Sequence, residues 1–152
     1  MRRWHCIDSQ TMSRTFHIVN GPNLNLLGKR EPEKYGHASF DEYLDALRSE
    51  FADERIEYFQ SNVEGELIDY LQSVGFESSG IVLNAGGYTH TSVALRDAVA
   101  AIDSPVVEVH ITNIHAREEF RHVSLLSPVC RAVICGLGLQ GYSAAVRALY
   151  RG

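Results

Sequence analysis

Apolar residues along the chain follow two alternating patterns, short continuous runs and longer stretches with helical spacing. The short runs predict five strands, at residues 15–20, 56–61, 80–84, 106–110 and 132–135. Helical spacing predicts four helices between and after them, at residues 39–53, 62–74, 92–102 and 139–151. Polar residues mark several helix starts: Ser39 with Glu42 forms a capping-box pattern, Asn62 is an expected N-cap, and either Thr91 or Ser92 caps the third helix.

This alternation of strands and helices favours an α/β fold. Parallel strands need crossover helices, and right-handed crossovers place helices on both faces of the sheet. We therefore predict a flavodoxin-like three-layer sandwich with a five-stranded parallel sheet. The 152 residues suit one domain, with residues 1–15 as an N-terminal extension and residues 16–152 as a single catalytic domain.

Ligands of such sheets bind beyond the carboxyl ends of the strands, so the strand-to-helix loops are the expected site. Four of these loops are polar or glycine-rich, at residues 20–38, 84–91, 110–121 and 136–140. The first is long for a compact domain and carries Asn23, Arg30 and Tyr35. A tyrosine with a pKa of about 10 is a poor base unless a cation such as Arg30 favours its anion. We expect this loop to close over an anionic ligand.

The fourth strand carries two groups suited to proton transfer. Side chains alternate along a strand, so Glu108 and His110 share one face near its carboxyl end. A carboxylate beside an imidazole indicates a general acid or base. The competing reading is a metal site, but His115 and His122 complete no familiar ligand spacing with this pair. We therefore expect no metal.

The third loop and the segment after His110 add binding candidates. Asn84 and His90 flank a glycine turn that leads into a helix, where backbone N–H groups can bind an anion or a hydroxyl. Arg117 and Arg121 lie one helical turn apart and are expected to face one direction, with Arg121 the stronger candidate for binding a carboxylate.

The stretch Gly136–Gly141 matches G-x-G-x-x-G, a pattern of dinucleotide-binding sites. That site also needs a later strand with an acidic residue for the ribose, and the sequence offers none before Gly152. The pattern is therefore read as a tight turn that lets the last helix pack closely on the sheet.

Composition narrows the possible partners. The net charge is −5, from 14 basic and 19 acidic residues, which disfavours nucleic acid, and no apolar run has the ~20 residues of a membrane span. Three cysteines, Cys6, Cys130 and Cys135, form no close pair and indicate a reducing, cytoplasmic compartment.

Five segments together resemble a known family, type II 3-dehydroquinate dehydratase. They read NGPNLNLLGKREPEKYG, QSNVEGELID, LNAGGYTHTSVALRDA, VEVHITNIHAREEFR and GLGLQGY. The resemblance implies a flavodoxin-like subunit, a homododecamer and no cofactor. It also implies dehydration of 3-dehydroquinate to 3-dehydroshikimate, in aromatic biosynthesis through the shikimate pathway or in quinate breakdown.

The same resemblance implies roles for individual residues. Tyr35 would be the base that forms an enolate, Arg30 would keep it ionised, and His110 would be the acid that protonates the leaving hydroxyl. Asn23 would position a water at the enolate, and Glu108 would orient His110. The substrate-binding residues would be Asn84, His90, Asp97, Arg121 and the backbone of Ile111 and Thr112, with Arg117 as an additional candidate.

Two alternatives remain at this point. An imine-forming lysine could perform a similar elimination, but Lys29 and Lys34 both lie in the first loop and not on a buried strand. The chain could also be a non-catalytic flavodoxin-like domain that binds a small ligand.

Overall fold

The strands form the parallel sheet that the sequence predicts. The computed structural model describes residues 13–29, 33 and 39–150. In this part of the chain five strands pair in the order β2-β1-β3-β4-β5, all parallel. They are β1 (Thr15–Asn20), β2 (Arg55–Gln60), β3 (Gly80–Asn84), β4 (Val106–His110) and β5 (Ala132–Cys135). Only β2 differs from its expected range, beginning and ending one residue earlier.

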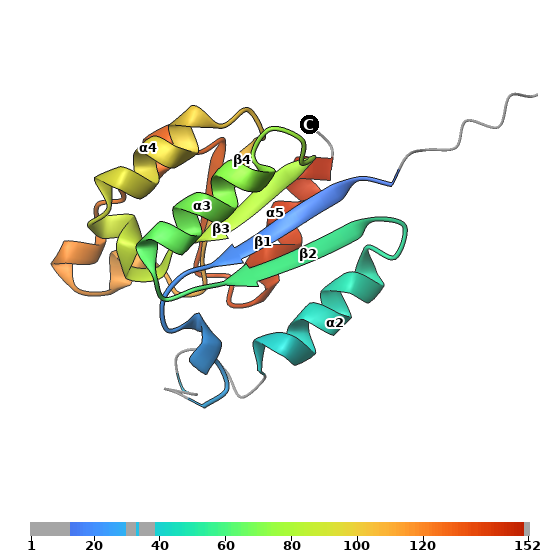
Figure 1. The fold of residues 1–152 in the computed structure, drawn as a ribbon. Coiled ribbons are helices and arrows are strands. Elements are labelled where there is room, and N and C mark those ends of the chain that lie inside the picture. The colour runs from blue at the N-terminus through green and yellow to red at the C-terminus, as the bar shows by residue number, and fades with distance from the viewer. Residues whose placement is uncertain (1–12, 30–32, 34–38, 151–152) are drawn as a thin grey trace, which may run out of the picture.

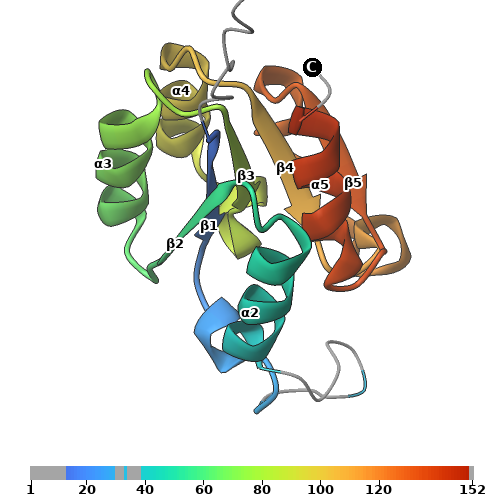
Figure 2. The same cartoon turned by 90° about the vertical axis from the view of Figure 1, so that its right-hand side faces the viewer.

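Helices cover both faces of this sheet (Figure 1). The α-helices in the described residues are α2 (Phe40–Glu50), α3 (Glu64–Val74), α4 (Val93–Ala101) and α5 (Gln140–Tyr150). Figure 2 shows α3 and α4 on one side of the strands and α2 and α5 on the other. The predicted α/β three-layer arrangement is confirmed.

Two apolar cores explain why the central strands read as continuous apolar runs. Phe16 and Ile18 of β1 point into the core under α2 and α5, whereas Val19 points into the core under α3 and α4. Every residue of β3 and β4 is buried. A strand covered on both faces needs apolar side chains in both directions, so it shows no polar alternation.

Most helix starts agree with the sequence. Ser39 and Glu42 form the expected capping box at α2, and Ser92, rather than Thr91, caps α4 through Leu95 N at 2.8 Å. The prediction for Asn62 is wrong, because Val63 holds the N-cap position of α3. The Asn62 amide oxygen instead accepts hydrogen bonds from Asn23 N and Gln60 Nε2, at 3.0 and 3.1 Å.

The glycine-rich turn before α5 is the structural feature that the sequence indicates. Gly136 and Gly138 adopt positive φ angles of 84° and 59°, which side chains rarely allow. A Cβ atom at Gly141 would lie 3.3 Å from Val109 Cγ1, so a glycine there lets α5 approach the sheet closely.

Among the described residues, no helix is long and apolar enough to cross a membrane.

Candidate active site

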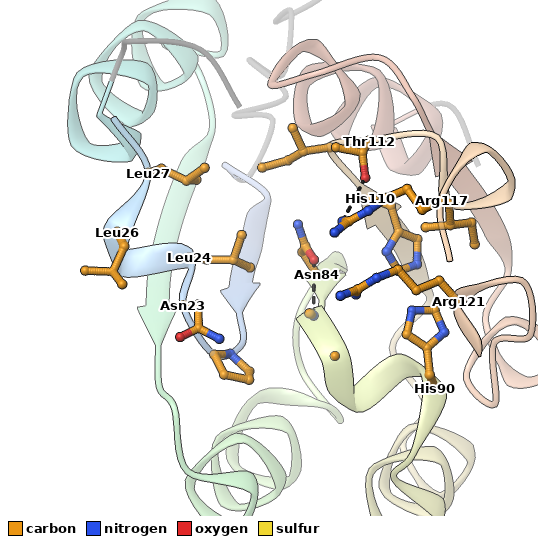
Figure 3. Close-up of a pocket in the computed structure, with 15 residues that line it drawn as sticks. Asn23, Leu24, Leu26, Leu27, Asn84, His90, His110, Thr112, Arg117 and Arg121 are labelled. Carbon is orange, nitrogen blue, oxygen red and sulfur yellow. Dashed lines mark hydrogen bonds between the residues drawn. The ribbon is translucent and has the colours of Figure 1, made fainter. Parts of the chain in front are cut away.

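A pocket with a volume of about 190 Å³ opens at the carboxyl ends of β1, β3 and β4 (Figure 3). The loops that follow these three strands line it, while the fourth predicted loop, residues 136–140, does not. The strand order changes direction between β1 and β3, because β2 lies on one side of β1 and β3 to β5 lie on the other. The pocket therefore occupies the switch point where α/β sheets bind ligands.

The two walls of the pocket differ in chemistry. Leu24, Leu26 and Leu27, in and just after the short 3-10 helix Leu24–Leu26, form an apolar wall beside Asn23. The opposite wall is polar and carries His110 and two arginines (Figure 3). Asn23 has a φ angle of 69°, a left-handed conformation that asparagine tolerates better than most residues. This conformation starts the 3-10 helix and places Asn23 at the pocket.

His110 and Glu108 form the pair that strand alternation predicts. His110 Nε2 lies 2.7 Å from Glu108 Oε1, and both side chains are almost completely buried. Because an ionised carboxylate only accepts hydrogen bonds, Nε2 carries a hydrogen. The other ring nitrogen, Nδ1, makes no hydrogen bond with any residue in the described part of the chain. It is the atom through which His110 can exchange a proton with a ligand.

Glu108 is held as an anion despite its burial. Burial raises the pKa of this carboxyl, but hydrogen bonds from His110, Ser127 and Ser124 outweigh that effect, and the net pKa lies below its usual value. A buried carboxylate stabilises a positive charge on the imidazole that it contacts. The pair is therefore suited to general acid catalysis by His110.

Asn84 and His90 lie where the third loop was expected to bind a ligand. His90 Nδ1 lies 2.8 Å from the carbonyl of Val123 and donates to it, which leaves Nε2 as an acceptor in the neutral ring. The Asn84 amide donates to Tyr142 Oη at 2.8 Å and accepts from Gly86 N at 3.2 Å. Its second amide hydrogen remains for a ligand, and both residues line the pocket.

Arg117 and Arg121 both line the pocket, but not because they share a helix. Arg117 is extended, between two short 3-10 helices, and Arg121 ends the second of them. They converge because both approach Glu118 Oε2, through their Nε atoms at 3.5 and 2.8 Å. These guanidinium groups make the polar wall cationic and suited to a carboxylate.

Backbone groups complete this wall. Ile111 and Thr112 follow β4 directly and line the pocket, and their N–H groups make no hydrogen bond with other described residues. The Thr112 hydroxyl accepts from Arg117 Nη1 at 3.3 Å. Two free N–H groups beside His110 can bind a ligand oxygen.

Four of the predicted site residues are not among those that line the pocket. Glu108 is fully buried and contacts His110, which does line it. Arg30 and Tyr35 lie outside the described residues. Asp97 lies on α4, two-thirds exposed, and pairs with Arg96 Nη1 at 3.1 Å. It does not line the pocket of its own chain.

Some residues that support the site carry no signal in the sequence. Tyr142 Oη joins Asn84 to Asn20, whose side-chain oxygen lies 2.8 Å away. Hydroxyl groups of Thr89, Ser124 and Ser127 contact Glu108. No local pattern marks these residues, because they meet only when distant loops come together.

In the part of the chain that the structure describes, no group of three His, Cys, Asp or Glu side chains could hold a metal ion.

Comparisons with known proteins point to one family. The model of the family described as "Dehydroquinase class II" matches residues 14–150. A 3-dehydroquinate dehydratase of Azorhizobium caulinodans is 54% identical over 140 residues, covering 91% of this chain and 95% of the relative. The 3-dehydroquinate dehydratase 1 of Agrobacterium fabrum is 51% identical, with coverages of 91% and 97%.

A solved structure shows the same architecture. The type II dehydroquinase from Butyrivibrio crossotus superimposes with a TM-score of 0.87 at 42% sequence identity. The match covers 91% of this chain and 98% of that chain. The similarity therefore extends over nearly all of both chains.

Proposed function

Because the chain belongs to the class II dehydroquinase family, we propose that it converts 3-dehydroquinate to 3-dehydroshikimate and water. One observation of the site supports this proposal most directly: a buried His110–Glu108 pair borders a pocket with two arginines. The substrate is a small carboxylate that loses a hydroxyl group, so it needs both an anion-binding wall and an acid. Arg117 and Arg121 are our candidates for the wall, and His110 is our candidate for the acid.

The elimination has two halves, and we propose separate groups for each. Tyr35 removes the proton next to the ketone, Arg30 favours its ionised form, and Asn23 holds a water at the enolate. His110 then donates a proton from Nδ1 to the leaving hydroxyl, while Glu108 stabilises the imidazolium through Nε2. Separating the base from the acid lets each keep the protonation state that its step requires.

We propose that the polar wall orients the substrate for this chemistry. The Arg121 Nη groups make no hydrogen bond with the described residues, so they can bind the carboxylate in a bidentate manner, with Arg117 as a second cation. Asn84, His90 and the N–H groups of Ile111 and Thr112 bind the hydroxyls. The apolar wall formed by the three leucines excludes bulk water from the enolate, apart from the single water that Asn23 holds.

Asp97 has a place in this proposal only across subunits. Its carboxylate is exposed on α4 and does not line the pocket of its own chain. It can meet a substrate if a second copy presents its Asp97 there, which the proposed homododecamer would allow. Analytical ultracentrifugation should then give about twelve times the chain mass of 17.0 kDa, and a monomer would contradict this assembly.

The test is to mix the purified chain with 3-dehydroquinate and follow ultraviolet absorbance. The product contains a conjugated enone and the substrate does not, so absorbance should rise. His110→Ala and Tyr35→Phe should each abolish the rise while circular dichroism stays native. No rise with the folded wild-type chain would instead favour the non-catalytic binding domain. Inactivation by borohydride with a trapped lysine adduct would replace the enolate mechanism with an imine at Lys29 or Lys34.

A further inference from the structure

Three hydroxyl groups surround the carboxylate of Glu108, and we call them the hydroxyl cage. Thr89 Oγ1 and Ser124 Oγ donate to Oε1 at 3.2 and 2.7 Å, and Ser127 Oγ donates to Oε2 at 2.6 Å. His110 Nε2 also contacts Oε1. Glu108 itself is fully buried, so these contacts replace the water that an exposed carboxylate would bind.

We infer that the hydroxyl cage sets the proton affinity of the Glu108–His110 pair, and that Ser127 is a positioning residue for the acid step. This inference rests on the proposed role of His110 as the acid. It assigns a catalytic consequence to residues that do not line the pocket and therefore act through Glu108.

The physical reason is that the hydroxyl donors of the cage stabilise part of the negative charge on the Glu108 carboxylate. A hydroxyl that donates to a carboxylate stabilises the anion and weakens its attraction for other protons. With the cage in place, the carboxylate still orients the His110 ring but holds the imidazolium proton less strongly. The proton on Nδ1 is then released more easily to a leaving hydroxyl.

Ser127 is the member of the cage whose loss is easiest to interpret. It is the one hydrogen-bond donor to Glu108 Oε2 in the described part of the chain, whereas Oε1 has three donors. Ser124 Oγ also accepts from Leu126 N and Ser127 N, at 3.1 and 3.0 Å, and so holds the loop itself. Removing the Ser127 hydroxyl takes away the donor to Glu108 Oε2 and leaves the two hydrogen bonds to Ser124 Oγ intact.

Other charged and titratable groups near the pair stay the same in such a variant. The His90 ring centroid lies 6.3 Å from that of His110, and Arg117 and Arg121 line the same pocket. Burial and the charge of Glu108 raise the pKa of Cys130 to about 12, so this thiol is neutral. A change in titration can then be attributed to the lost hydroxyl.

The experiment compares kcat as a function of pH for the full-length wild-type chain and Ser127→Ala. Removing a donor raises the proton affinity of both coupled groups, so the limbs of the profile that report the pair should move to higher pH by about one unit. KM should stay within about twofold, since Ser127 does not contact the pocket. Ser127→Thr keeps a hydroxyl and should restore the profile. An NMR titration of the His110 ring proton, identified by its loss in His110→Ala, should follow the same shift.

A matched control is available at another hydroxyl–carboxylate contact. Ser143 Oγ donates to Glu50 Oε1 at 2.6 Å, the same distance as at Ser127, but away from the pocket. Ser143→Ala should leave the pH profile unchanged. Thr89→Val preserves shape, removes the longer contact to Oε1, and should shift the profile in the same direction by less.

A folded Ser127→Ala variant with the wild-type profile would overturn the inference. If His110→Ala is inactive in the same assay, the proposed function stands and only the role of the cage is lost. An active His110→Ala would instead remove the acid assignment itself. Should Ser127→Ala fail to fold, an unchanged profile for Thr89→Val would overturn the inference on its own.

Discussion

Two buried histidines on the same face of the sheet have partners of opposite character, one neutral and one ionised. His17 on β1 and His110 on β4 are both less than a tenth exposed and both point toward the side of α3 and α4. His17 Nδ1 contacts the neutral phenol of Tyr70 at 2.9 Å, whereas His110 Nε2 contacts an ionised carboxylate at 2.7 Å. Burial alone therefore does not give a histidine the ionised partner that the proposed acid step requires.

A carboxylate also lies beside His17, so a neighbouring carboxylate alone does not distinguish the two histidines. Glu57 is its register partner on β2, but the Glu57 carboxylate pairs with Arg55 and is about one-third exposed. The pKa of His17 is lowered, because burial outweighs the opposing effect of Glu57 and Arg55 adds to the lowering. Glu108 instead has hydroxyl donors and no arginine partner among the described residues. The two sites therefore differ in their anion: the carboxylate beside His110 is held by hydroxyl groups and has no arginine partner in the described part of the chain.

The largest effect should come from removing that anion. Glu108→Gln gives His110 a neutral partner, as His17 has, so the imidazolium loses its stabilisation. We expect kcat to fall by roughly 100-fold or more, the usual range for general acid catalysis, with a smaller change in KM. Steady-state absorbance assays measure both constants. Glu57→Gln, which alters the carboxylate beside His17, is the control and should keep kcat within about twofold. Near-normal kcat in Glu108→Gln would show that the anion is dispensable.

A smaller effect concerns stability at acid pH. The folded-state pKa of His17 lies below its unfolded value of about 6.5, so the unfolded chain binds more protons there. The contribution of neutral His17 is therefore fully present above about pH 6.5 and is lost as the pH falls below that value. Between about pH 7.5 and pH 5, Tm should fall less in His17→Gln than in the wild type. At the higher pH the variant should differ by no more than about 4 °C.

His115→Gln provides the matched control for this measurement, because His115 is exposed. Its Tm should depend on pH as that of the wild type does. An equal dependence in His17→Gln would show that His17 does not contribute to acid sensitivity.

The smallest effect should come from Arg55→Ala, which brings His17 closer to the situation of His110. Removing Arg55 leaves Glu57 without its partner and raises the pKa of His17 toward its usual value. The loss of Tm at acid pH should then be smaller than in the wild type. Stability at neutral pH should change by less than about 1 kcal/mol, because Arg55 is about 71% exposed. Differential scanning calorimetry at several pH values measures both quantities, and an unchanged acid dependence would contradict the role given to Arg55.

Much of the fold and part of the site could be read from local patterns. The apolar runs gave the strands nearly residue by residue, since strands covered on both faces are apolar throughout. The pairing of Glu108 with His110 follows from alternation along one strand, which needs no information from elsewhere in the chain. Asn84 is the last residue of β3, and His90 lies in the loop that follows. Because ligands of parallel sheets bind beyond the carboxyl ends of the strands, the sequence predicts both residues at the pocket.

Other expectations failed or succeeded for reasons outside the local pattern. Asn62 looked like a helix cap, but the backbone of Asn23 and the side chain of Gln60 engage its amide oxygen instead. Arg117 and Arg121 do converge, although through Glu118 and not through helical spacing. A partner from a distant segment decided the first case, whereas the second depends on a neighbouring carboxylate in a backbone that is not a continuous helix.

The sequence by itself determined the parallel sheet, the loops at its carboxyl edge and the Glu108–His110 pair on β4, because each depends on neighbours a few residues apart. Only the tertiary structure decided what surrounds that pair. The strand order places the loops after β1, β3 and β4 around one pocket. It also brings Thr89, Ser124 and Ser127 to Glu108 across separations of 16 to 19 residues. Hydroxyl groups in loops carry no periodic signal, so their common target appears only once the chain is folded.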